Sequence, residues 1–465
     1  MRRVLQFTVI FSGVLFFIGL TTGFGQTADP NKEANQLISS PSASYPRVPG
    51  TSIVTGPAQP ASASPTLVFP ANATTSRAAL TTKTSGAAKS NSGSASSNTK
   101  GSNSKSDDSD GDNRAAQGKI RGATTVPVFT GVFAQGFNDF PFIMMGRNPA
   151  LGGTTVIPAK ITTVSLQLLN PDGTLRASLP YAPFEDLTLD SPNFEEANYA
   201  SGRQIQFTDA VQRAEFFNSM GDDWHTVLHP TVVDRVTNQV PRFVNVQFPD
   251  GSVKSVQNYF VGTAADGEKF IFLLDLFFNF INTNTVVNEI NANNFTTNAL
   301  NLAVYPNTFL FSIDNQGNIA SCCTLGFHTF FADTTVTPAP RWVFGFASWM
   351  APGVFSGGAA DITPLSHEIT EAVNDPFVDN FVPVWQFPGI PGACQNTLET
   401  GDPVEVLPNS VVNVTIRERH EVFTFHPQTE ALLQWFEQLP TSDALGGAFS
   451  FPDTTALPHA ATPCF

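Results

Sequence analysis

A short run of residues, Ser366 to Pro376, carries one histidine and two glutamates at spacings that suit metal chemistry. His367 and Glu371 are four residues apart, so on a helix their side chains lie on the same face. Two side chains so placed can reach one metal ion. This is the H-E-x-x-H geometry of zinc peptidases, with the second histidine replaced by Glu371. In that geometry the middle acid, here Glu368, is not a ligand but the base that acts on a metal-bound water.

A third metal ligand is expected further along the chain, because catalytic zinc sites use three protein ligands and keep one position open. The segment Leu398 to Pro403 holds the two candidates, Glu399 and Asp402. We predict that Glu399 completes the site and that Asp402 is an alternate ligand or supports a ligand. A site this rich in carboxylates has a weaker preference for zinc, so calcium and manganese are alternatives.

The element that must position His367 is a helix with well-marked ends. Thr363 can cap it, Pro364 suits the first helical position, and Asn374-Asp375-Pro376 ends it. We expect an apolar face in the core and an opposite polar face toward a cleft. The apolar face consists of Ile362, Leu365, Ile369, Ala372 and Val373, and the polar face of His367, Glu371 and Asn374. Upstream, Arg341 to Ala347 is predicted to be an edge strand along which an extended peptide could lie.

Other histidines have simpler interpretations. His328 could be an oxyanion donor or a further ligand, but a core histidine bonded to the backbone is favoured. His225 and His229 also have the i, i+4 spacing, yet Pro230 and the β-branched neighbours favour a loop. His420-Glu421 lies in a segment that alternates with period two, which predicts a solvated strand over residues 412–425.

The rest of the globular part reads as α+β, with more strand than helix. A helix is expected over residues 207–217, with Thr208 or Asp209 as its cap. The Phe-rich run over residues 270–281 is expected in the core, and phenylalanine is abundant overall, at 42 residues. Further strands are predicted over residues 125–133, 161–169 and 307–313.

The N-terminal quarter has the composition of targeting and linker sequence. A basic start, an apolar run from Val4 to Leu20, and the small residues Gly23 and Gly25 predict a signal peptide over residues 1–25. The alternative is an uncleaved membrane anchor, because the apolar run approaches the ~20 residues that span a bilayer. Residues 26–120 are rich in Ser, Thr, Ala, Gly and Pro and predict a disordered linker. The acidic run Asp107 to Asp112 is interpreted as solvated linker rather than a calcium loop.

Charge and cysteine content narrow the class of protein. The net charge of −15 argues against nucleic acid, because phosphate binding needs clustered Lys and Arg. It suits a secreted or extracytoplasmic protein, in which the even number of cysteines, four, suggests disulfides. We expect Cys394 to pair with Cys322 or Cys323, and Cys464 to hold the C-terminus. A Cys322–Cys323 bond is less favoured. Membrane contact is expected only through an uncleaved N-terminal segment, and no oligomeric state is predicted.

The motif Ser-His-Glu-x-x-Glu-Ala-x-x-Asp-Pro resembles one in exported bacterial proteins that are distantly similar to plant exordium (phosphate-induced) proteins. Gly326-Phe327-His328 before the helix and Glu399-Thr400-Gly401-Asp402 after it match in order, so the resemblance covers roughly residues 305–405. It implies a zincin-like fold, with a mixed sheet and an active-site helix, for that part. The relatives are better known for extracellular, growth-linked roles than for catalysis.

These observations divide the chain into a β-rich part over residues 121–300 and a zincin-like metal-site region over residues 301–465. The first functional hypothesis is a zinc-dependent peptidase acting on a protein or peptide, with His367, Glu371, Glu399 and Asp402 at the metal and Glu368 as base. The second is a non-catalytic extracellular or cell-wall-associated protein with a structural metal site. The third is a protein that binds no metal at this helix.

Overall fold

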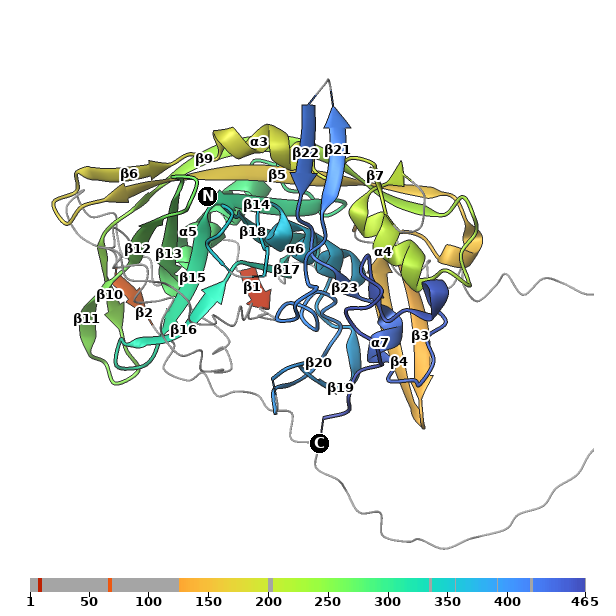
Figure 1. The fold of residues 1–465 in the computed structure, drawn as a ribbon. Helices are drawn as coiled ribbons and strands as arrows, with labels where there is room; N and C mark the ends of the chain where they lie inside the picture. Colours follow the sequence, from red (N-terminus) through yellow and green to blue (C-terminus); the bar gives the residue numbers. More distant parts are fainter. Residues whose placement is uncertain are drawn as a thin grey trace, which may run out of the picture.

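A computed structural model describes residues 7–10, 66–68, 125–199, 204–333, 337–355, 357–390, 392–418 and 421–464. The predicted signal peptide and linker, including Asp107 to Asp112, lie outside the described residues apart from Phe7–Ile10 and Thr66–Val68. Strands predominate over helices, as expected, and a curled mixed sheet runs through the molecule (Figure 1). Among the described residues, no helix is both long enough and apolar enough to cross a membrane.

The largest sheet has the strand order β1-β17-β18-β14-β5-β6, with β9 also paired to β5. Pairing is parallel for β14 with β18 and β5 and for β5 with β9, and antiparallel for the remaining neighbours. The sheet therefore joins strands from both sides of residue 300. Its strands are β1 (Phe7–Ile10), β5 (Thr154–Leu169), β6 (Leu175–Leu179), β9 (His225–Val240), β14 (Leu300–Pro306), β17 (Gly326–Asp333) and β18 (Arg341–Trp349).

Alternating side chains of the central strands enter two different hydrophobic clusters. In β14, Leu302 and Val304 pack on one side of the sheet, whereas Ala303 and Tyr305 pack on the other. Every residue of β14 is buried, as expected for a parallel strand with both faces covered. Each face of this sheet therefore contributes side chains to a separate hydrophobic cluster.

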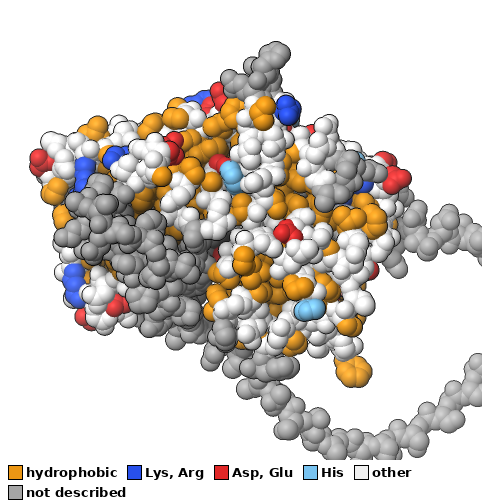
Figure 2. All heavy atoms as spheres, viewed as in Figure 1, with side chains coloured by type: hydrophobic (Ala, Val, Ile, Leu, Met, Phe, Trp, Pro, Cys, Tyr) orange, Lys and Arg blue, Asp and Glu red, His pale blue; other side chains and the backbone are white. Residues whose placement is uncertain are grey.

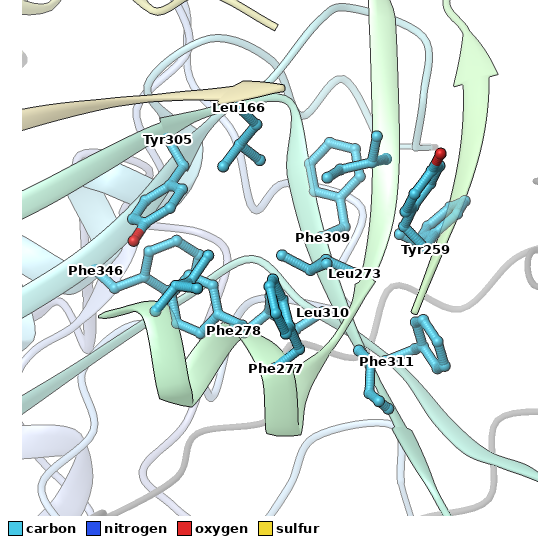
Figure 3. Close-up of a cluster of buried hydrophobic side chains, with 14 of the residues drawn as sticks. Leu166, Tyr259, Leu273, Phe277, Phe278, Tyr305, Phe309, Leu310, Phe311 and Phe346 are labelled. Atoms are coloured by element: carbon cyan, nitrogen blue, oxygen red, sulfur yellow. The ribbon is translucent and has the colours of Figure 1, made fainter. Parts of the chain in front are cut away.

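A four-stranded sheet and helix α5 (Asp275–Asn291) cover the face on which Ala303 and Tyr305 lie. The sheet has the order β12-β13-β15-β16, formed by Tyr259–Thr263, Lys269–Leu274, Thr308–Ile313 and Ile319–Thr324. Between them lie packed aromatic side chains such as Phe278, whose ring centroid is 4.3 Å from that of Phe346 (Figure 3). The predicted core role of residues 270–281 is confirmed, although the run divides between β13 and α5.

Helix α6 (Thr363–Asn374) lies against the opposite face, beside α4 (Phe207–Glu215) (Figure 1). Both helices and their approximate bounds match the sequence predictions, but the predicted caps do not. The N-cap of α4 is Gln206 rather than Thr208 or Asp209, and that of α6 is Ile362 rather than Thr363. All residues of α6 are buried, so the predicted polar face does not border an open cleft. The predicted edge strand was also wrong: β18 pairs on one side with β14 and on the other with β17.

Short hairpins and helices complete the structure. The hairpins are β3/β4 (Val128–Gln135, Asn138–Met145), β7/β8 (Ala197–Asn198, Gln204–Ile205), β19/β20 (Phe381–Gln386, Cys394–Thr397), β21/β22 (Val414–Glu418, Glu421–Phe425) and β23/β24 (Glu430–Ala431, Ser450–Phe451). A small sheet joins β2 (Thr66–Val68), β10 (Phe243–Gln247) and β11 (Val253–Gln257). The remaining helices are α3 (Ala182–Leu189), α7 (Leu433–Phe436) and the 3-10 turns Pro149–Leu151 and Leu445–Gly447.

Two local predictions fail for identifiable reasons. The predicted loop around His225 and His229 is the start of β9, a sixteen-residue strand of which fifteen residues pair with β5 and in which Pro230 is accommodated. The predicted strand over residues 412–425 is instead the β21/β22 hairpin, because period-two alternation continues through both arms of a hairpin.

The disulfide pattern also differs from the prediction. Cys322 pairs with Cys323, and Cys394 pairs with Cys464. The cause is spatial: Cys322 and Cys323 lie on β16, whereas the C-terminal segment runs along β19, where the Cys464 amide donates to the Val384 carbonyl. Cys464 does hold the C-terminus, but through Cys394.

Candidate metal centre

Helix α6 is fixed at its start by hydrogen bonds rather than by a capping side chain of the residue before it. Ile362 is the N-cap, and Pro364 lies in the first turn as expected. The Thr363 hydroxyl donates to the Ala360 carbonyl at 2.8 Å and contacts the His426 carbonyl oxygen at 2.6 Å. The apolar residues of α6 join the hydrophobic cluster on this face of the sheet. These contacts fix the direction in which His367, Glu368 and Glu371 point.

Strand β17 presents its even-numbered residues to α6. Phe327 and Phe331 belong to the α5 side of the sheet, so Gly326, His328 and Phe330 face the other way. His328 Nδ1 is 3.2 Å from Glu371 Oε2, which overturns the expectation of a core histidine bonded to the backbone. The period-two pattern of β17 was the sequence signal that could have placed His328 beside the helix.

Glu371 lies at the middle of the cluster, with a different histidine at each carboxylate oxygen. Its Oε1 is 3.1 Å from His367 Nε2, and its Oε2 is the atom that meets His328. Oε1 also accepts a hydrogen bond of 3.1 Å from the Gly401 amide. The predicted i, i+4 pair on α6 therefore faces one buried polar centre together with His328.

The segment after β20 brings in the other two predicted residues. Glu399 Oε2 is 3.6 Å from His328 Nδ1, and Asp402 Oδ1 is 3.7 Å from His367 Nε2. Glu368 Oε2 is 3.9 Å from His328 Nδ1. The five residues predicted for the site and His328 thus lie together, each at most 1 % exposed.

Two glycines allow this close packing. A Cβ on Gly401 would lie 2.3 Å from His367 Nδ1, and a Cβ on Gly326 would lie 2.5 Å from Glu368 Oε1. Real Cβ atoms essentially never approach so closely. Glycine at these positions therefore lets the Glu399–Asp402 segment and β17 press against α6.

The segment that carries Glu399 and Asp402 is held by backbone and amide hydrogen bonds. The Ala431 amide donates to the Thr400 carbonyl at 2.7 Å, and Gln428 Nε2 donates to the Gly401 carbonyl at 2.6 Å. Gln428 is itself tied to α6, since its amide donates to Ser366 Oγ at 2.9 Å. The predicted acids are therefore rigidly placed although they lie outside a helix.

The carboxylates are short of hydrogen-bond donors. Within the described part of the chain, neither oxygen of Glu399 and neither oxygen of Asp402 has a hydrogen-bond partner. Burying a carboxylate without donors or a counter-ion costs several kcal/mol, on the order of the effective penalty for a buried ion. Such a group either stays protonated or lies next to a cation.

The pKa shifts reflect the same imbalance. Burial, together with the charge of Glu371, raises the pKa of Glu399 and of Asp402 well above the usual range. Burial also raises the pKa of Glu371, but the neighbouring His367 and His328 outweigh it and lower that pKa to about 2. For His328, burial lowers the pKa, and the charges of Glu399 and Glu371 outweigh it to give about 9. Without a metal, Glu371 and His328 carry the charge and the outer acids hold protons.

Two sets of donor atoms are close enough to hold a metal ion. One set comes from His328, Glu368 and Glu371, and the other from His367, Glu371 and Asp402, with the ligand atoms of each set within 4.8 Å of one another. All of these residues are buried. Two imidazoles and several carboxylates form a donor set that suits zinc or manganese.

The cluster is enclosed. A cavity of about 1020 Å³ lies elsewhere, between α4, β9 and β21, and is lined by Asp209, His225 and Arg417, among others. None of the cluster residues lines it. On the face of the molecule shown in Figure 2, acidic side chains are few and scattered. The dense group of acids is therefore an interior feature.

Comparison with protein-family models, with curated proteins and with solved structures finds no match for this chain.

Proposed function

We propose that this chain is a metal-binding protein whose functional centre is the buried cluster of His328, His367, Glu371, Glu399 and Asp402. The observation that carries the proposal is the pair of buried acids, Glu399 and Asp402, whose oxygens have no hydrogen-bond partner among the described residues. A divalent cation would supply the missing positive charge. All four cysteines form disulfides, and the first 25 residues have the composition of a signal peptide. We therefore place the role of the protein outside the cytoplasm.

The donor set favours zinc, with manganese next. Imidazole nitrogens suit zinc, whereas calcium prefers six to eight oxygen ligands. His328 and His367 together therefore weigh against calcium, although the carboxylates alone would admit it.

Complete enclosure favours a non-catalytic role as the main assignment. Structural zinc sites are closed by protein ligands, whereas catalytic sites keep a position open to water and substrate. Every residue of this centre is at most 1 % exposed. An extracellular protein stabilised by a buried metal fits that enclosure best.

Peptide hydrolysis is the second candidate, and the edge of the main sheet supports it. The outer edge of β17 pairs antiparallel with Phe7–Ile10 through residues 330–333, and a substrate peptide would take the place of this segment. A peptide bound there would lie along the same edge. Bound zinc lowers the pKa of a coordinated water to about 7. Glu368 would accept the proton from that water.

One experiment separates the two candidates. The full-length chain is purified, its metal content is measured, and casein cleavage is compared between the wild type and Glu368→Gln, with the exposed His459→Ala as a matched control. A structural site predicts bound metal and no cleavage by any variant. A peptidase predicts cleavage by the wild type and by His459→Ala that Glu368→Gln abolishes. Wild-type protein without metal contradicts both candidates.

A further inference from the structure

The two oxygens of Glu371 face two different groups of ligands. Oε2 meets His328 Nδ1 at 3.2 Å, on the side where Glu368 and Glu399 approach the same nitrogen. Oε1 meets His367 Nε2 at 3.1 Å, on the side of Asp402. One carboxylate thus separates two sets of donor atoms.

From this arrangement we infer that the centre holds two metal ions bridged by the Glu371 carboxylate. The inference builds on the proposed metal binding but concerns the number of ions, which the proposed function leaves at one or more. The first ion would bind His328, Glu368, Glu371 and Glu399. The second would bind His367, Glu371 and Asp402.

The donor spacings agree with ions between them. Two ligands at about 2.1 Å from one zinc, in tetrahedral or octahedral geometry, lie roughly 3.0–3.4 Å apart. His328 Nδ1 and Glu371 Oε2 are 3.2 Å apart, and His367 Nε2 and Glu371 Oε1 are 3.1 Å apart. The remaining histidine–acid distances, 3.6 to 3.9 Å, need only small inward movements.

The charge of the centre also matches two ions. Glu368, Glu371, Glu399 and Asp402 would together carry four negative charges when ionised, and all are at most 1 % exposed. One divalent ion would leave two buried carboxylates uncompensated, whereas two divalent ions balance all four. The oxygens of Glu399 and Asp402, which lack partners among the described residues, lie on opposite sides of Glu371, one for each ion.

The two ions would differ in their surroundings. The first has four protein ligands, which is the count of a closed structural zinc site, and the second has three, which leaves a position for water. In this arrangement Glu368 is a ligand of the first ion. Replacement of Glu368 would therefore change the metal content as well as any hydrolysis.

The test measures metal content and the distance between metals. The full-length protein is loaded with zinc, dialysed and analysed by mass spectrometry alongside His328→Ala, His367→Ala and the control His459→Ala. Two zinc ions per chain are expected for the wild type and the control, and one for each variant of a cluster histidine. X-ray absorption of the wild type should show a zinc–zinc vector of about 3.5–4 Å, as in known two-metal sites.

A single zinc per wild-type chain, or two zinc ions without that vector, would overturn the inference. The absorption measurement needs no variant, so it decides the question even if a histidine variant fails to fold. One bound zinc would leave the proposed metal function intact, whereas absence of zinc and of every other metal would remove both.

Discussion

Histidines meet acids in two different ways in this molecule. His225 with Asp209 and His426 with Asp361 form pairs of one imidazole and one carboxylate, at 2.7 and 2.6 Å. In each pair the second carboxylate oxygen accepts a backbone amide, from Thr226 at 2.9 Å and from His426 itself at 2.9 Å.

The centre on α6 has no such balance. There the acids outnumber the imidazoles, and both oxygens of Glu399 and of Asp402 lack a hydrogen-bond partner within the described residues. In each pair both carboxylate oxygens have a partner, so the acid needs no further ion. In an acid-rich cluster sealed from water, the acids either hold protons or lie next to a cation, and this difference separates the proposed metal centre from ordinary histidine–acid contacts.

Metal removal should break the cluster and leave the pairs intact, and this is the largest effect we expect. A ligand present at a thousand times its Kd stabilises the folded state by about 4 kcal/mol. EDTA should therefore lower the Tm of the wild type by many degrees, as measured by differential scanning calorimetry, and added zinc should restore it.

Glu371→Ala serves as the control for chelation, because it lacks the residue shared by both donor sets. Its Tm should be low and insensitive to EDTA. Equal sensitivity of Glu371→Ala and the wild type would mean that the metal binds elsewhere.

A side chain at Gly401, beside His367, should cause the next largest loss of stability. A Cβ at Gly401 would lie 2.3 Å from His367 Nδ1, and forcing atoms into a packed interior costs typically 1–3 kcal/mol. Gly401→Ala should be destabilised by about 3 kcal/mol in urea unfolding and should lose zinc.

Gly136→Ala is the matched control, since nothing lies within 4 Å of a Cβ there although its φ is +64°. It should retain the full metal content and lose only about 1 kcal/mol, the usual cost of a strained backbone position. Retention of zinc by Gly401→Ala would show that the packing of Gly401 against His367 is not needed for the site.

The sequence predicted α6 and the His367–Glu371 pair because their signals are local, whereas Glu399 and Asp402 were proposed from the need for a third ligand. The i, i+4 spacing of His367 and Glu371 and the ends of the helix depend on neighbours in the chain. His328 was misjudged because its role depends on which face of β17 meets α6, a consequence of sheet packing. The pairing of Cys394 with Cys464 likewise follows from the path of the C-terminus along β19, which no local pattern encodes.

The burial of the whole cluster could not be predicted from the sequence either. An amphipathic pattern indicates which side of a helix is polar, but not whether that side meets solvent or other protein. The polar side of α6 faces β17 and the Glu399–Asp402 segment, both of which come from distant parts of the chain. The polar side of α6 therefore lies in the protein interior and not in the expected cleft.

Glu215 is a buried acid with no histidine partner, and it can be compared with the two kinds of histidine–acid contact. Burial raises the pKa of Glu215 to about 8, although its Oε1 accepts hydrogen bonds from Asn374 Nδ2 and from the Leu433 amide. The folded state keeps this proton above pH 4.5 while the unfolded state loses it, so its contribution to stability falls as the pH rises from 4.5 to 8.

Glu215→Gln should remove that pH dependence while its side-chain oxygen keeps both hydrogen bonds. Stability changes by at most about 1.4 kcal/mol per pH unit for one proton, so the variant should gain about 2 kcal/mol over the wild type between pH 5 and pH 7. Urea unfolding at both pH values measures the gain. A constant difference between the two proteins would mean that Glu215 ionises normally in the fold.

The partly exposed pair of His426 and Asp361 should have the smallest effect on stability, because ion pairs near the surface contribute at most about 1 kcal/mol. The hydrogen bond to Asp361 raises the pKa of His426, so the contribution of the pair is complete below pH 6.5 and fades as the pH rises through the raised pKa. His426→Ala should therefore lose less than about 1 kcal/mol near pH 6, and less still at pH 9. The same variant should retain all its zinc, because Asp361 keeps its hydrogen bond from the Ile362 amide at the start of α6. Loss of zinc from His426→Ala would show that the pair and the cluster are one system, and the distinction between them would fail.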